Sequence, residues 1–101
     1  MRMLKGLIEH IREEAEDVHA YAEEAIRVRE DDPPLATVYA ELAREEMNHA
    51  ERLHKVAVDL IERAHRAGKN PPEVMKEIWD YEHKIMIEEM AEAKAMLELH
   101  K

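Results

Sequence analysis

The chain has 101 residues, of which 39% are charged and 46% apolar, and its formal net charge at pH 7 is -9. This length suits one domain with one core, and a composition with only two Gly and no Phe is typical of long helices rather than β architecture. The negative charge argues against nucleic acid or an anionic membrane as partner, and the absence of Cys leaves carboxylates and imidazoles as metal ligands. No apolar run approaches the roughly 18 residues of a membrane span, so we expect a cytoplasmic protein.

The first predicted helix covers residues 2–30. Its apolar positions recur three and four residues apart, which is the spacing of one helix face. They form a continuous seam of Leu4, Leu7, Ile8, Ile11, Ala15, Val18, Ala22, Ala25 and Ile26. Glu14 borders this seam and is therefore a candidate for a carboxylate near the core.

The second predicted helix covers residues 33–67 and begins after Asp32, an N-cap residue type followed by Pro33 at a position suited to the first turn. Its apolar positions are predicted to be Leu35, Val38, Leu42, Leu53, Val56, Leu60, Ala64 and Ala67. Glu46 and His49 occupy the gap in this seam, where apolar residues are expected. The pattern therefore predicts that two potential metal ligands face the core.

The third predicted helix covers residues 71–100. Gly68 suits a left-handed C-terminal cap, and Asn70 with Glu73 has the spacing of a capping box. The apolar seam, Met75, Ile78, Ile85, Met86, Ala93, Met96 and Leu97, is interrupted by Glu82 and Glu89. Because the connections are short, the whole chain, residues 1–101, is predicted to be one all-α domain of three long antiparallel helices, completed to a larger bundle by oligomerisation.

A Glu and a His three residues apart on a helix project side by side and can bind one ion. The chain contains four such pairs, so the spacing alone is a poor signal. The other three pairs are Glu16 with His19, Glu51 with His54 and Glu62 with His65. The residues of the last two pairs are predicted to point away from the seam of the second helix, and Glu16 away from that of the first. Burial therefore favours Glu46 and His49 as ligands, because an ionised side chain in the core needs a partner or a metal.

Glu14 is the best candidate for a second carboxylate, and Glu82 could add a further oxygen. Each assignment has an alternative that involves no metal. Glu46 and His49 could pair with each other or with an Arg and fix the register of the bundle. Glu14 alone could be a solvated flanking residue, and Glu82 could form a salt bridge with an Arg or a Lys.

The first two predicted helices together resemble the half-site unit of ferritin-like proteins, including rubrerythrins and encapsulated ferritins. The first helix carries Glu14, and after a short turn the second contains the sequence Glu45-Glu46-Met47-Asn48-His49. The resemblance covers residues 8–62. It implies a di-iron site in which Glu14, Glu46 and His49 are contributed by each of two chains. The third helix has Glu82 but Ile85 three residues later, so one chain lacks a second half-site. The chain also ends in a predicted helix where encapsulated ferritins carry a targeting tail.

The predicted function is iron binding at a site that holds two irons. The predicted activity is oxidation of Fe(II) by dioxygen or peroxide, as in a ferroxidase-type enzyme. Manganese and zinc remain alternatives to iron. The predicted partner is a second copy, in a homodimer or larger homo-oligomer whose two-fold interface covers Glu82 and Glu89. Two other functions stay open. One is metal binding without turnover. The other is a metal-free interaction protein that uses the Met-rich face of the third helix around Trp79.

Overall fold

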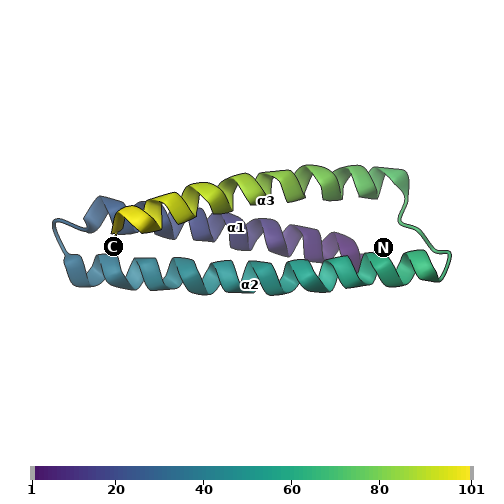
Figure 1. Cartoon of the computed structure of the whole chain (residues 1–101), viewed down its shortest axis with the longest axis horizontal. Coiled ribbons are helices and arrows are strands. Elements are labelled where there is room, and N and C mark those ends of the chain that lie inside the picture. Colours follow the sequence, from purple (N-terminus) through teal and green to yellow (C-terminus); the bar gives the residue numbers. More distant parts are fainter. Residues whose placement is uncertain (1, 101) are drawn as a thin grey trace.

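The structure is a computed structural model that describes residues 2–100. It contains three helices, α1 from Arg2–Val28, α2 from Pro33–Arg66 and α3 from Glu73–His100. The helices run up, down and up in a slender molecule of 55 × 18 × 18 Å (Figure 1). The predicted all-α fold of three long antiparallel helices is confirmed.

The ends of the helices agree closely with the capping signals in the sequence. The Asp32 side chain accepts a hydrogen bond of 3.2 Å from the backbone N–H of Leu35 and caps α2. Gly68 has φ +71°, and the backbone N–H groups of Gly68 and Lys69 donate to the carbonyls of His65 and Ala64. This pattern is a Schellman C-cap, in which a glycine takes the left-handed conformation.

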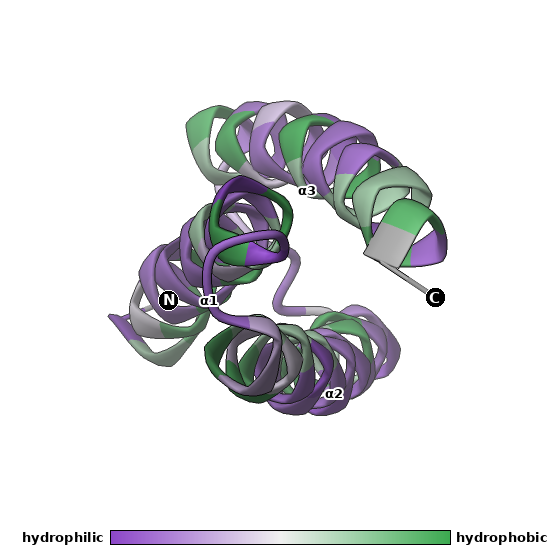
Figure 2. Cartoon of the chain, turned by 90° about the vertical axis from the view of Figure 1, so that its left-hand side faces the viewer, coloured by the Kyte–Doolittle hydropathy of each residue, from purple (hydrophilic) through white to green (hydrophobic). Residues whose placement is uncertain are grey.

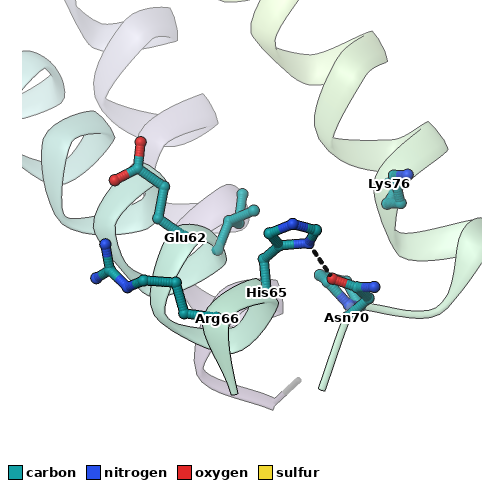
Figure 3. Close-up of a pocket in the computed structure, with 7 residues that line it drawn as sticks. Glu62, His65, Arg66, Asn70 and Lys76 are labelled. Atoms are coloured by element: carbon teal, nitrogen blue, oxygen red, sulfur yellow. Dashed lines mark hydrogen bonds between the residues drawn. The ribbon is translucent and has the colours of Figure 1, made fainter. Parts of the chain in front are cut away.

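The predicted capping box of α3 is wrong. The Asn70 side chain lies 2.8 Å from the Nδ1 atom of the His65 ring, and the helix begins later, at Glu73. The Pro72 carbonyl accepts the first helical hydrogen bonds, from Met75 and Lys76. Asn70 therefore links the end of α2 to the connecting segment, at a surface pocket that includes Glu62, Arg66 and Lys76 (Figure 3).

The core lies along α1, which packs against both other helices, whereas α2 and α3 contact each other little (Figure 2). The predicted seam of α1 is confirmed at seven positions that are buried: Leu4, Ile8, Ile11, Ala15, Val18, Ala22 and Ala25. Large side chains fill the part of the core near Leu4, while Ala predominates in the part around Ala22. The small side chains there allow the backbones of α1 and α2 to approach closely.

The predicted seam of α2 is only partly correct, because Leu53 and Leu60 pack against the core but other predicted positions are exposed. The helix buries a line of alanines, namely Ala36, Ala40, Ala43, Ala50 and Ala57. Leu35, Val38 and Val56 are instead exposed by 39%, 48% and 52%. One residue corresponds to a rotation of about 100° around a helix, so Leu35 and Val56, each one residue before a buried alanine, lie outside the line that faces α1. The close packing of α1 and α2 that small alanines allow therefore stabilises the fold more than burial of the more hydrophobic Leu and Val residues would.

Candidate metal site

Glu14, Glu46 and His49 come together on the outer side of the α1–α2 pair. The Nδ1 atom of His49 lies 3.5 Å from Glu14 Oε2 and 3.6 Å from Glu46 Oε1. One ligand atom from each of the three residues lies within 4.8 Å of the others, and this is the one group of that kind among residues 2–100. The side chains of Glu14, Glu46 and His49 are exposed by 15%, 22% and 51%, respectively.

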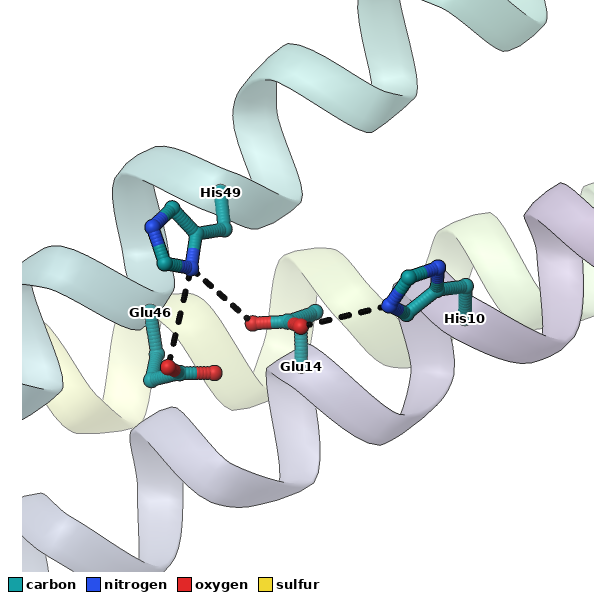
Figure 4. Close-up of polar contacts among 4 residues, drawn as sticks. All are labelled: His10, Glu14, Glu46 and His49. Carbon is teal, nitrogen blue, oxygen red and sulfur yellow. Dashed lines mark ion pairs between the residues drawn. The ribbon is translucent and has the colours of Figure 1, made fainter.

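The placement follows from the packing of α1 against α2. Ala15 and Ala50 are buried between the helices, so the neighbouring residues Glu14 and His49 lie at the edge of this contact. The expectation that His49 faces the core is therefore wrong, because the buried line of α2 passes through Ala50. The imidazole points outward over the two carboxylates instead of into the bundle (Figure 4).

Glu14 influences the ionisation of Glu46. The hydrogen bond with Glu14, partial burial and the negative charge of Glu14 together raise the pKa of Glu46 to about 7, against the opposing effect of His49. Near neutral pH the pair therefore tends to keep one proton. A divalent cation would replace that proton and neutralise the same repulsion, which is the physical reason that this donor set fits a metal.

His10 is a member of the site that the sequence analysis did not single out. Its Nε2 atom lies 3.5 Å from Glu14 Oε1, so Glu14 has an imidazole on each side (Figure 4). His10 precedes Glu14 by four residues on the same helix face, and this spacing was the available signal. A histidine in this position can orient a carboxylate ligand through its second oxygen.

Glu82 lies apart from this group. Its Oε1 atom is 3.3 Å from Arg12 Nη1, across the contact between α1 and α3. Arg12 and Glu14 are two residues apart and hence lie on different sides of α1. The structure therefore does not bring Glu82 into the site. It shows instead the salt bridge that was the alternative for this residue.

The other Glu-x-x-His pairs have different surroundings. His19 contacts α3, with its two ring nitrogens 2.9 Å from Glu23 and 2.8 Å from Glu92. Glu89 lies in the same region, and its pKa is raised by burial. His54 was expected to point outward but stacks against Trp79 and His83 of α3. Glu16, Glu51, Glu62 and His65 are exposed as expected.

Comparison of the chain with protein-family models, curated proteins and solved structures gives no match. No helix within residues 2–100 combines the length and the apolar character that a membrane span requires.

Proposed function

We propose that the protein binds iron through Glu14, Glu46 and His49 and that two copies combine their half-sites into a di-iron centre. The observation that carries this proposal is the convergence of two carboxylates and one imidazole from two helices. Oxygen-rich donors with one imidazole per ion suit iron in both of its common oxidation states, and manganese and zinc are alternatives. The resemblance of residues 8–62 to ferritin-like half-sites supports the same assignment.

A second copy would complete the site because one chain offers only three ligands, of which the imidazole is turned to the surface. His49 is half exposed, so an ion held by the three residues would lie at the surface. Three protein ligands leave positions of an octahedral ion open. The matching carboxylates of a partner related by a two-fold axis could fill or bridge these positions, since such an axis brings the same residues together from both copies.

The surface around His49 supports this arrangement. Leu35, Leu42, His49 and Val56 recur every seven residues along the outer side of α2, and Val38 lies beside them. A stripe with this period suits packing against another helix. Glu45 and Arg52 flank His49 on opposite sides, so an antiparallel copy of α2 would place each acidic group near a basic group of the partner.

This arrangement changes which face we expect the partner to cover. The sequence favoured an interface over Glu82 and Glu89, but both residues lie on the α3 side of α1. The candidate ligands open on the α1–α2 side. A shared site therefore requires an interface formed by α1 and α2, with α3 on the outside of the dimer.

The proposed activity is oxidation of Fe(II) by dioxygen or peroxide. Two Fe(II) ions supply two electrons, enough to reduce one dioxygen to peroxide. The part of this chain is to bind and position the ions: Glu14 and Glu46 supply negative charge, which favours the ferric product, and His10 holds Glu14 in place.

Metal analysis of the purified protein tests the ligands. Replacing Glu46 and His49 together by Ala is expected to lower bound iron at least about 10-fold, since two of three ligands are lost. The matched control is Glu62→Ala with His65→Ala. These two substitutions remove a Glu-x-x-His pair from the C-terminal end of the same helix, away from the candidate site (Figure 3). Equal iron content in both double variants would refute the ligand assignment.

Activity and assembly are measured separately. Ferric absorbance after addition of Fe(II) under air should rise faster with the parent protein than with the double variant Glu46→Ala, His49→Ala. Equal rates at full metal occupancy of the parent would indicate a protein that binds metal without turnover.

Native mass spectrometry with and without chelator tests the dimer, because an ion bound only between two copies promotes their association. A fully loaded monomer would exclude the shared site.

The metal-free alternative has little support from the structure. It requires that the methionines of α3 form an exposed face, but Met90 is buried and Met86 and Met96 pack against the core. Trp79 is likewise engaged with His54 and His83. These side chains therefore contribute mainly to the contact of α3 with the rest of the chain.

A further inference from the structure

Three aromatic rings form a stack between α2 and α3. The His54 ring of α2 lies 4.8 Å from the His83 ring and 5.4 Å from the Trp79 ring, measured between centroids. The rings of Trp79 and His83 are 5.6 Å apart, and all three planes lie within 20° of one another. We call these three residues the imidazole–indole stack.

The stack occupies a sensitive place in the fold because α2 and α3 otherwise touch little. Further along α3 a groove separates the two helices, lined on one side by Glu51 and on the other by Met86, Ile87, Met90 and Lys94. The stack is therefore one of the direct contacts between α3 and α2, beside apolar side chains of both helices that pack against the shared core. Its strength should influence how closely the two helices stay together.

The surroundings of His54 favour a neutral ring. Its Nε2 atom is buried and has no hydrogen-bond partner among the residues that the structure describes. Burial lowers the pKa of His54, and the nearby His83 lowers it further. A proton on Nε2 would place an unpaired charge in a small cavity whose α1 side consists of Ile8 and Ile11.

The charged groups near the stack do not reverse this effect. Glu82 of α3 lines the same cavity, and its Oε1 atom faces Arg12 of α1 at 3.3 Å, while its Oε2 atom is buried without a hydrogen-bond partner among the described residues. That pairing leaves less negative charge available to a protonated His54. The remaining titratable neighbour is His83, which repels a second positive charge at the short distance of the stack.

We propose that the imidazole–indole stack is an acid-sensitive latch that holds α3 against α2 when His54 is neutral and releases it when His54 is protonated. The unfolded chain binds the proton on His54 more readily than the folded chain does. The contribution of the stack is therefore complete above the ordinary histidine pKa of about 6.5 and is lost as the pH falls through the lower pKa of folded His54. This latch involves no metal and does not depend on the proposed iron site.

Trp79 is the one tryptophan of the chain, so its fluorescence reports on the stack directly. Chelator-treated protein titrated from about pH 8 to 5 is expected to show a change in Trp79 emission with a midpoint below about 6.5. His54→Gln should abolish this transition. His65→Gln, a substitution of an exposed histidine on the same helix, should leave it unchanged.

Release of α3 is measured as a distance. The chain contains no Cys, so Glu51→Cys and Lys94→Cys provide two unique positions for spin labels across the groove. The distance between the labels should lengthen over the same pH range as the fluorescence change, and His83→Gln should shift the midpoint upward by removing the repelling neighbour.

Three outcomes would overturn the latch. The first is a midpoint above about 6.5, which would mean that protonated His54 pairs with Glu82 and strengthens the contact. The second is a transition that persists in His54→Gln. The third is a label distance that stays constant while the fluorescence changes, which would reduce the effect to local quenching of Trp79.

Discussion

His49 and His54 lie five residues apart in α2, and each follows a Glu by three residues, yet their surroundings differ in almost every respect. His49 is half exposed and lies beside two carboxylates, where one helix packs against another through alanines. His54 is partly buried between aromatic rings and aliphatic side chains. Five residues correspond to a rotation of about 140° around a helix, which turns the second histidine from the α1 edge towards α3.

These two histidines show that the chemical role of a Glu-x-x-His pair depends on the residues of the helix packed against it. Acidic neighbours make His49 a candidate ligand, because they favour a bound cation. Burial lowers the pKa of His54, so its surroundings favour the neutral ring. The same three-residue spacing is therefore compatible with a metal site, a packing contact or, at His65, a surface hydrogen bond.

The largest expected effect on stability concerns the alanine contact beside His49. Ala50→Leu should destabilise the fold by about 1 to 3 kcal/mol, because the added side chain must force α1 and α2 apart. Ala20→Leu, at an exposed position of α1, is the matched control and should change stability by less than about 0.5 kcal/mol. Urea unfolding of both variants measures the difference. Equal effects would contradict the close packing of α1 against α2.

A smaller effect is expected from removing the charge of Glu46 in metal-free protein. The raised pKa of about 7 means that the folded state holds a proton which the unfolded state releases near pH 4.5. Stability should therefore fall as the pH rises from 4.5 through 7. Glu46→Gln should remove this dependence and stabilise the protein at pH 8 by on the order of 1 kcal/mol, a value reduced for solvent screening.

The control for this prediction is Glu45→Gln, the exposed neighbour, which should keep the pH dependence of the parent. Glu46→Gln should also bind iron more weakly, so that one substitution stabilises the metal-free fold and impairs the site. A Glu46→Gln variant that was less stable than the parent at pH 8 would show that Glu46 is held by a favourable ion pair instead.

The smallest effect is expected at Glu82. Glu82→Gln weakens a single partly exposed ion pair with Arg12, so stability should change by less than about 1 kcal/mol. Bound iron should stay within twofold of the parent, because Glu82 lies on the other side of α1 from Glu14. Elemental analysis of this variant measures the iron content. A clear loss of iron would mean that the metal site extends from the His49 region towards α3.

Much of the fold could be predicted because it depends on local rules. The breaks at Asp32–Pro33 and Gly68, together with the periodic apolar residues of α1, follow from backbone geometry and helix period, which act over a few residues. The line of buried alanines in α2 could not be predicted in the same way. Alanine is only weakly hydrophobic, so its importance appears only when another helix packs closely against it.

The sequence by itself determined three helices, their order and the closeness of Glu46 to His49, because these depend on spacing along one chain. The tertiary structure decided which side each residue faces. It turned His49 outward beside Glu14, paired Glu82 with Arg12 and stacked His54 on His83. The physical reason is that helix rotation is set by side-chain packing between helices. A change of one residue in the packed line moves every side chain of the helix by about 100°.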